Sequence, residues 1–378
     1  MYVGQSESPS RIASLDQFRG YTVFGMFLVN FVGSYAAVRT ALPVLAHHHT
    51  YFSYADSIMP HFFFAVGFAF RLTFIKRAVT QGRSSAYWHA LRRNLTLMLV
   101  AFVVHSAGSG WQSWADQDQF DKFLAQWAKR DVFQTLTHIA VTSVWVMPVI
   151  AARSGARVAW AVASGLVHLG LSYWFNYNWV NTSPLGIDGG PLGFLTWAVP
   201  LLAGSLACDA WAADTDRVRV FRRLLGWGVV VMGLGYGLSC LHLSPADQDE
   251  WHFRVTVTAV PPPFVHVEAK PPTNDLFSMS QRSGSLTYLT FGAGLSLAAY
   301  ALFVLASDVG RWQLGLLRTL GVNALVGYIL HEVVNAAVKP FVPKDSPLWY
   351  VLLGCGVSIA ICYVLLRGLE KQRLYLKL

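Results

Sequence analysis

The sequence predicts an all-α membrane protein with about ten transmembrane helices, and its composition supplies the first reasons. Of its 378 residues, 54% are hydrophobic and only 13% are charged, whereas soluble domains carry about a quarter charged residues. The mean hydropathy is +0.41 over the whole chain, so apolar residues fill whole segments, as they do where lipid is the solvent. The formal charge of +9 is expected from cytoplasmic loops rich in Lys and Arg, and we expect no nucleic-acid partner.

About ten stretches of roughly 20 mainly apolar residues are long enough to cross about 30 Å of hydrocarbon. If the amino terminus lies in the cytoplasm, most Lys and Arg residues fall at the cytoplasmic ends of these stretches, as the positive-inside rule predicts. We therefore expect both termini in the cytoplasm. Residues 1–17 show no cleavable signal peptide, which favours a bacterial inner membrane. The predicted spans are 19–39, 57–75, 93–110, 133–151, 156–175, 191–210, 222–243, 284–307, 315–337 and 347–367.

The chain is expected to form one transmembrane domain, residues 1–378, with a long extracytoplasmic loop at 244–283 between the seventh and eighth spans. In that loop, alternating residues on both sides of Pro261–Pro263 favour two short strands or extended segments. The loop is either a solvated connection or a lid over a substrate. In the seventh span, the spacing of Gly233 and Gly237 favours tight packing against a neighbouring helix.

Polar side chains within the membrane are costly, so they are the first candidates for function. Asn30 lies in the middle of the first predicted span, where it either joins helices or takes part in a reaction. Asp56 begins the second span and follows three adjacent histidines at 47–49. It either caps the helix or supports a histidine that acts as a base. Adjacent side chains diverge and no further ligand follows at a suitable spacing, so we expect no metal site.

Polar groups also occur at the ends of other spans. Asp16 and Arg19 share one helix face at the cytoplasmic end of the first span, as an anchor with a local ion pair or as part of a site. His331 and Glu332 lie near the outer end of the ninth span and are either interfacial or functional. Four further histidines are interpreted as structural: His61, His105, His138 and His168.

Four segments carry a family resemblance when they are taken together. Ser14–Thr22 reads SLDQFRGYT, Met26–Asn30 reads MFLVN, and Ala55–Pro60 reads ADSIMP. Leu320–Glu332 reads LGVNALVGYILHE, which contains a Gly-x-Asn and a Tyr-x-x-His pattern. In this order, the segments resemble the catalytic region of heparan-α-glucosaminide N-acetyltransferase and its bacterial relatives.

The resemblance implies a transmembrane acyltransferase, possessing a reaction centre built from a loop histidine and the asparagine of the first span. Such an enzyme takes acetyl-CoA from the cytoplasmic side and passes the acetyl group to the amine of a terminal glucosamine on the other side. It also suggests a homodimer. By position, Asn30 matches the asparagine of the reaction centre and Asp56 matches the Ala-Asp of the second span. Asn323 and His331 match the late motif and are the expected substrate-binding residues.

The histidine loop departs from the family pattern. It is one residue shorter and lacks a Trp-Asn-Gly element, so either His47 or His48 is the expected base and the acceptor is open: an amine or a hydroxyl of a sugar or glycan. Attack on a thioester needs a base and a donor for the oxyanion, and Asn30 suits the second role. The transfer is either direct or passes through an acyl-histidine. The phosphates of acyl-CoA need cations, for which the cytoplasmic side offers three arginines: Arg19, Arg92 and Arg93.

The competing hypothesis is a transporter or flippase for a sugar or a lipid-linked substrate. It rests on the predicted number of spans and on the few intramembrane polar residues. Neither a pair of broken helices nor an internal repeat, both common in transporters, is evident in the sequence.

Overall fold

The computed structural model describes residues 11–49, 51–106, 117–242, 256–257, 259–265 and 275–374. This part of the chain is almost entirely helical. The longer helices are α1 Ala13–Val32, α3 Tyr54–Gln81, α4 Arg83–Ser106, α6 Thr135–Val146, α7 Ser154–Leu171, α9 Gly193–Ala213, α10 Arg217–Ser239, α11 Leu286–Phe303, α13 Ala324–Val338 and α14 Leu348–Lys371. The shorter helices are α2 Ala36–Ala41, α5 Gln117–Gln126, α8 Tyr177–Asn181 and α12 Gly315–Val322.

Short helical turns and one small sheet complete the secondary structure. Three are 3₁₀ turns: η1 Pro43–Leu45, η4 Gly190–Leu192 and η6 Lys339–Phe341. Three are π-helical segments: η2 Trp127–Asp131, η3 Ser172–Asn176 and η5 Val304–Val309. The strands β1 Leu241–His242 and β2 Thr256–Val257 pair in antiparallel fashion.

Several helices are long and apolar enough to cross a membrane, as the composition predicts. Within the described residues there are five by length and hydropathy, and a sixth if the bent α12–α13 pair forms one span. A helix occupies each of the ten predicted stretches, but the others are shorter or more polar. Ten crossings and two cytoplasmic termini therefore stay predictions. The five are Tyr54–Gln81, Ser154–Asn181, Gly190–Ala213, Leu286–Val309 and Leu348–Lys371.

The ninth predicted span, 315–337, is not one continuous helix. It breaks at Asn323, and the two parts are bent by 94°. Asn323 has φ −115° and ψ 37°, outside the helical region. Asparagine is unfavourable inside helices, because its side chain hydrogen-bonds to nearby backbone groups in non-helical conformations. The preceding α12 is held against α1 at Gly321, where a Cβ atom would lie 2.0 Å from the carbonyl oxygen of Asp16. The close backbone contact fixes α12, and the chain then turns into α13.

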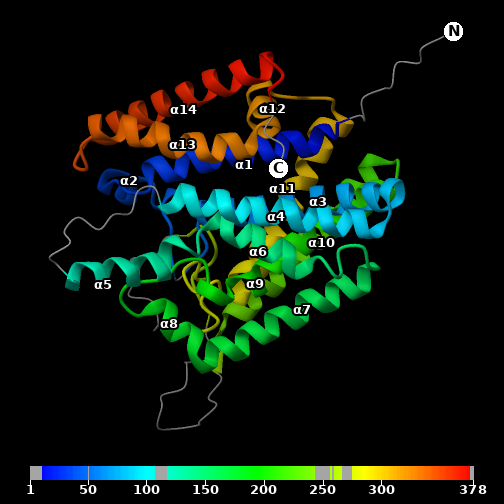
Figure 1. The fold of residues 1–378 in the computed structure, drawn as a ribbon, viewed down its shortest axis with the longest axis horizontal. Helices are drawn as coiled ribbons and strands as arrows, with labels where there is room; N and C mark the ends of the chain where they lie inside the picture. The colour runs from blue at the N-terminus through cyan, green and yellow to red at the C-terminus, as the bar shows by residue number, and fades with distance from the viewer. Residues whose placement is uncertain are drawn as a thin grey trace.

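The helices pack in layers around a buried centre (Figure 1). α13 and α14 run beside α1 on one side of the molecule, α7 lies on the opposite side against α9, and α3, α4 and α6 lie between them. α3 and α9 touch through reciprocal glycines: a Cβ atom on Gly67 would lie 1.8 Å from the Leu201 oxygen, and one on Gly204 would lie 1.9 Å from the Phe64 oxygen. Only glycine permits this backbone approach.

The glycine face predicted in the seventh span is wrong. A Cβ atom added to Gly233 or Gly237 of α10 would meet nothing within 4 Å. The face that packs against α11 is formed by other glycines of the same helix. A Cβ atom on Gly228 would lie 2.8 Å from the Ala298 nitrogen, and one on Gly235 would lie 2.5 Å from the Phe291 nitrogen.

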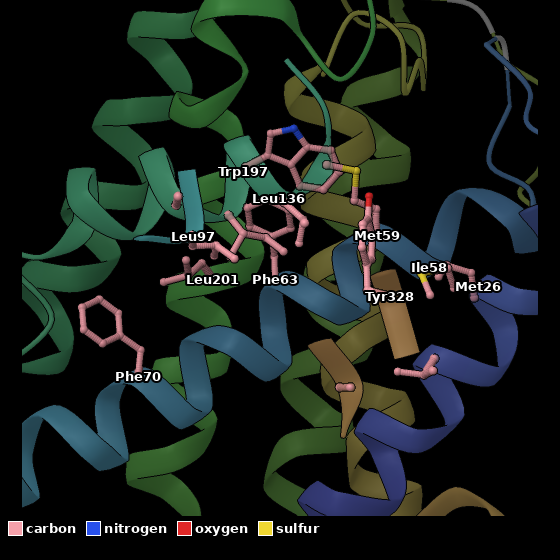
Figure 2. Packing of buried hydrophobic residues seen from close by; sticks show 14 of the residues in the cluster. Met26, Ile58, Met59, Phe63, Phe70, Leu97, Leu136, Trp197, Leu201 and Tyr328 are labelled. Atoms are coloured by element: carbon pink, nitrogen blue, oxygen red, sulfur yellow. The ribbon is translucent and has the colours of Figure 1, made fainter. Parts of the chain in front are cut away.

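The centre of the molecule is aromatic. Phe63 of α3 stacks on Trp197 of α9 with ring centroids 4.5 Å apart. Figure 2 shows this pair with Met59 and Leu136, and Tyr328 of α13 beside Met59. The cluster thus joins α3, α6, α9 and α13.

Part of the predicted outer loop is described. β2 lies in it, as the alternation predicts, and its partner β1 follows α10 directly. In the described residues 259–265, the Phe264 backbone N–H donates to the Phe52 oxygen at 2.7 Å, and the Val260 oxygen accepts from the Tyr236 hydroxyl at 3.1 Å. The proline segment is therefore fixed beside Phe52, next to the start of α3. The rest of the loop, 244–255, 258 and 266–274, lies outside the described residues.

Candidate functional site

The loop before α3 brings His47 and Asp56 together. His47 Nδ1 lies 2.9 Å from Asp56 Oδ1. Asp56 Oδ2 accepts from the Ser53 backbone N–H at 3.0 Å and from the Ser53 hydroxyl at 2.8 Å, and Ser53 in turn accepts from the Asp56 backbone N–H, which completes a capping box. The sequence left two roles open for Asp56. One carboxylate oxygen caps α3 and the other holds the His47 imidazole, so the cap is confirmed and the role beside a base stays a prediction.

The two candidate histidines differ in their surroundings. The His48 ring donates from Nε2 to the Pro43 oxygen at 2.9 Å and stacks on Tyr51 with centroids 4.3 Å apart. The His47 side chain is 40% exposed, whereas its partner Asp56 is 1% exposed. With its Nδ1–H donated to a carboxylate, His47 keeps an acceptor lone pair on Nε2. His47 therefore has the geometry of a general base, while His48 is engaged in the loop.

The charge around His47 favours basicity. Burial lowers the pKa of His47, but the hydrogen bond to Asp56, the charge of Asp56 and, to a smaller extent, the charge of Asp188 more than reverse this effect. The pKa of His47 is therefore raised above its ordinary value. A carboxylate behind an imidazole fixes the tautomer and strengthens the base.

A second pair joins α1 to α13. Asn30 Nδ2 lies 3.0 Å from His331 Nε2, and His331 Nδ1 donates to the Tyr328 oxygen. Glu332 Oε1 lies 3.2 Å from the same Nε2, and the Lys339 ammonium donates to the backbone carbonyl oxygen of Asn30 at 2.9 Å. His331 is buried. Its Nε2 therefore faces both the Asn30 amide and the Glu332 carboxylate.

The sequence predicted Asn30 in the middle of the first span, and this position is wrong. Asn30 belongs to the last turn of α1, which ends at Val32, and its side chain is exposed. The histidine loop packs against this end of α1, because a Cβ atom on Gly33 would lie 3.2 Å from the Leu45 oxygen and 3.7 Å from Ala46 Cα. The Asn30–His331 pair and the His47–Asp56 pair thus belong to the same end of α1.

A cavity of about 500 Å³ lies between α1, α3, α4, α6 and the α12–α13 break. Arg19 and Arg93, two of the predicted cofactor-binding residues, line it, and so does Arg77, which was not among them. Arg92 is exposed and lies outside the lining, because it occupies a different face of α4 from Arg93. A cofactor-binding role for Arg92 therefore gains no support from this cavity and stays a prediction. Apolar side chains form most of the wall, including Phe70, Leu97 and Leu136, which appear in Figure 2.

Asn323 and Tyr328 also line the cavity. Asn323 is 3% exposed, and neither of its polar side-chain atoms has a hydrogen-bond partner within the described residues. Tyr328 connects the cavity to the second pair, since its carbonyl oxygen holds the His331 ring. The structure therefore brings Arg19, Arg93 and Asn323 to one cavity, with His331 adjacent through Tyr328.

Sequence reasoning missed Asp188. This carboxylate is buried, accepts from Gln281 Nε2 at 3.1 Å, and has a positive φ of 54°. Burial raises the pKa of Asp188 to about 7, against lowering effects from Gln281, His47 and Arg130. The signal was an acidic residue in the segment Gly186–Gly190, because glycines flanking a carboxylate mark a turn with special backbone angles.

The histidines interpreted as structural divide into two groups. His61 Nδ1 pairs with the Ser296 hydroxyl at 2.7 Å, and His168 contacts the Ser172 hydroxyl. The buried Nε2 atoms of His105 and His138 have no hydrogen-bond partner among the described residues. The His138 ring is nevertheless hydrogen-bonded to the Phe133 backbone, and the His105 ring packs against Tyr328, so these two rings are only partly satisfied and their structural role stays a prediction. Among the described residues there is no group of three or more His, Cys, Asp or Glu side chains with the arrangement of a metal site.

The described part of the chain is helical, with several helices long and apolar enough to cross a membrane. It pairs the partly exposed His47 with the buried Asp56, and it has a mainly apolar cavity that three arginines also line. A comparison with models of known protein families finds no matching model, and a comparison with curated proteins finds no match.

Proposed function

We propose that the protein is a membrane-embedded acyltransferase, which moves an acetyl or other acyl group from acyl-CoA to an amine or hydroxyl of a sugar acceptor. The observation that carries the proposal is the cavity. Arginines line it together with apolar side chains, and Tyr328 connects it to the Asn30–His331 pair. A phosphorylated carrier with a long, weakly polar arm and a reactive end matches this sequence of environments. The resemblance to the acetyltransferase family supports the same chemistry.

In the proposed reaction, His47 Nε2 accepts a proton from the acceptor amine or hydroxyl as that group attacks the thioester carbonyl. Asp56 holds the His47 ring in the required tautomer. The Asn30 amide donates to the oxyanion. The C–S bond then breaks, the thiolate takes a proton, and the acyl group stays on the acceptor. A route through an acyl-histidine has the same overall balance, with the nitrogen as a temporary carrier.

The test is release of free CoA thiol by purified protein in detergent, given acetyl-CoA and glucosamine, with transfer followed by mass. His47→Ala is expected to lose on the order of 10²–10⁴ in rate, and Asn30→Ala about 10²–10³. His48→Ala is the matched control. It is expected to keep activity, because the His48 ring bonds to the Pro43 carbonyl. Full activity in His47→Ala, with the loss in His48→Ala instead, contradicts the assignment of the base.

One observation favours the transporter hypothesis as a second candidate. The α12–α13 pair is a broken helix with a 94° bend, and broken helices form the substrate sites of many transporters. Flux of a labelled amino sugar into proteoliposomes without any acyl-CoA supports transport. Thiol release that requires both acyl-CoA and an acceptor supports the enzyme.

A further inference from the structure

The break between α12 and α13 carries an unusual helix start. Asn323 occupies the N-cap position of α13, yet its side chain makes no capping hydrogen bond. An asparagine at this position ordinarily accepts from a backbone N–H of the first turn. Here the amide is nine-tenths buried, lines the cavity, and has no partner among the described residues for its nitrogen or its oxygen. Leaving a buried amide unpaired is costly, so the position fits a ligand group.

The first turn of α13 adds donors to this amide. The Gly327 N–H donates to the backbone carbonyl oxygen of Asn323 at 2.8 Å, so the N–H groups of residues 324–326 precede the first intrahelical bond. Ala324, Leu325 and Val326 all line the cavity. A helix of 15 residues carries a partial positive charge at its start, and such starts bind phosphate and other anions.

The charges nearby agree with an anionic ligand. Gly321, two residues before the break, contacts the backbone of Asp16 in α1. Arg19 lies about one helical turn after Asp16 in the same helix, so the break is close to Arg19. Arg19 and Arg93 line the cavity, and no carboxylate side chain is among the described residues of its wall. The Asp16 carboxylate lies outside this wall. It interacts more strongly with Arg19 than with Arg11, to which it is ion-paired at 3.7 Å, so it offsets part of the Arg19 charge, while Arg93 lies beside Arg19.

We propose that Asn323, the start of α13, Arg19 and Arg93 together form a diphosphate-binding site, which holds the diphosphate of the acyl-CoA donor. This deepens the proposed function and rests on it. The Asn323 amide and the first N–H groups of α13 donate to phosphate oxygens, and the arginines neutralise their charge. His331 lies eight residues farther along α13 (331 − 323 = 8), which is about 12 Å at 1.5 Å per residue. The extended pantetheine arm of CoA is longer than this, so a thioester reaches the Asn30–His331 pair.

The test is calorimetric binding of three probes to the full-length protein in detergent: CoA, ADP and pantetheine. ADP carries the diphosphate without the arm, and pantetheine carries the arm without the diphosphate. Asn323→Ala is expected to weaken CoA and ADP by roughly tenfold to hundredfold, the range of a lost hydrogen bond to a charged group. Asn323→Asp, which places a negative charge there, is expected to weaken them further. Pantetheine affinity stays unchanged in both.

Asn335→Asp is the matched control. Asn335 is a buried asparagine of the same helix, its oxygen accepts from the Ser358 hydroxyl at 2.8 Å, and it lies outside the cavity wall. Its aspartate variant is expected to bind CoA and ADP like the wild type. If the Asn323 variants unfold at a lower temperature than this control, Arg93→Gln serves instead and is expected to lose ADP affinity while pantetheine affinity is kept.

The outcomes separate this site from the proposed function. Wild-type affinity for CoA and ADP in a folded Asn323→Asp protein overturns the diphosphate site and leaves the acyltransferase standing. ADP binding that depends on Asn323, together with no thiol release from any acyl-CoA, supports the site and overturns the function. If ADP fails to bind but short-chain phosphatidylglycerol binds in an Asn323-dependent way, the phosphate belongs to a lipid headgroup and the assignment to the donor is wrong.

Discussion

Exchanging Asp56 for asparagine separates the two roles of this side chain. In the wild type, Oδ2 accepts from the backbone and hydroxyl of Ser53, and Oδ1 faces His47 Nδ1 at 2.9 Å. In Asp56→Asn, the amide oxygen is able to keep the Ser53 bonds, which places the NH₂ group against His47. Two N–H groups cannot face each other, so His47 must move its proton to Nε2, the atom that acts as the base. The cap survives while the base is blocked.

The expected magnitudes follow from this arrangement. The rate of acyl transfer falls by on the order of 10²–10⁴, as expected when an imidazole is held in the wrong tautomer. The free energy of unfolding falls by about 1.5–3 kcal/mol, the worth of the lost hydrogen bond between His47 and a charged group, with no further loss from the cap, which remains. Ser53→Ala is the matched variant. It removes the capping hydroxyl at a cost of about 1 kcal/mol but leaves the His47–Asp56 bond, so its activity per folded molecule is expected to stay near that of the wild type.

The pH dependence gives a second readout of the same pair. His47 serves as a base only when it is neutral, and Asp56 raises its pKa, so the rate is expected to rise with pH through a midpoint above about 6.5, the ordinary value for histidine. In Asp56→Asn the residual rate is expected to rise at a lower pH. The assay is thiol release over a pH series, with thermal unfolding in the same detergent. Equal activity in Asp56→Asn and the wild type, or equal loss in Ser53→Ala, refutes the reasoning.

Three further predictions concern the cavity, the packing and the buried carboxylate. Arg77→Gln is expected to raise the KM for acyl-CoA by about tenfold, the effect of one lost charge-assisted bond, while Arg92→Gln leaves KM unchanged because Arg92 lies outside the cavity wall. Gly67→Ala is expected to lower the free energy of unfolding by about 1–3 kcal/mol, because the added Cβ atom would lie 1.8 Å from the Leu201 backbone oxygen. Gly233→Ala is the control. Its Cβ atom would meet nothing within 4 Å, so thermal unfolding in detergent is expected to show no loss of stability. Asp188, with a pKa raised to about 7 by burial, is most stabilising when protonated. Stability is therefore expected to fall as pH rises from about 4 to about 7, and Asp188→Asn, which keeps the acceptor for Gln281, should flatten that fall in unfolding measured across the pH series; an unchanged slope contradicts it.

Hydropathy located the helices because it depends only on composition along the chain. It did not locate the faces that pack, because a glycine's role depends on which helix lies beside it. On α10 the spacing of Gly233 and Gly237 satisfied the pattern for tight packing, yet the backbone of α11 lies against Gly228 and Gly235. All four residues look alike in the sequence. Only the position of the neighbouring helix distinguishes them.

The candidate site shows the same division between local and distant information. His47 and Asp56 are nine positions apart across one loop and a helix start, so the sequence was enough to suggest their pairing. Asn30 and His331 pair across 301 positions, and only the motif resemblance placed them in one site. The arginines were chosen by side of the membrane, a rule that cannot tell Arg93 from Arg92. The helical period decides this, because adjacent residues point to different faces.

The break at Asn323 is the feature that hydropathy concealed, and it gives α13 its place in the proposed mechanism. Apolar residues continue through 315–337, so a window average finds one span, while the backbone turns by 94° within it. The turn exposes a helix start in a cavity that Arg19 and Arg93 also line. From that start, α13 runs as one helix to His331, whose ring is held by Tyr328 of the same helix and by Asn30 of α1. A single helix thus sets the separation between the proposed diphosphate site and the proposed reaction centre. A continuous span would use these N–H groups in its own intrahelical hydrogen bonds, so the proposed site requires the break in the helix.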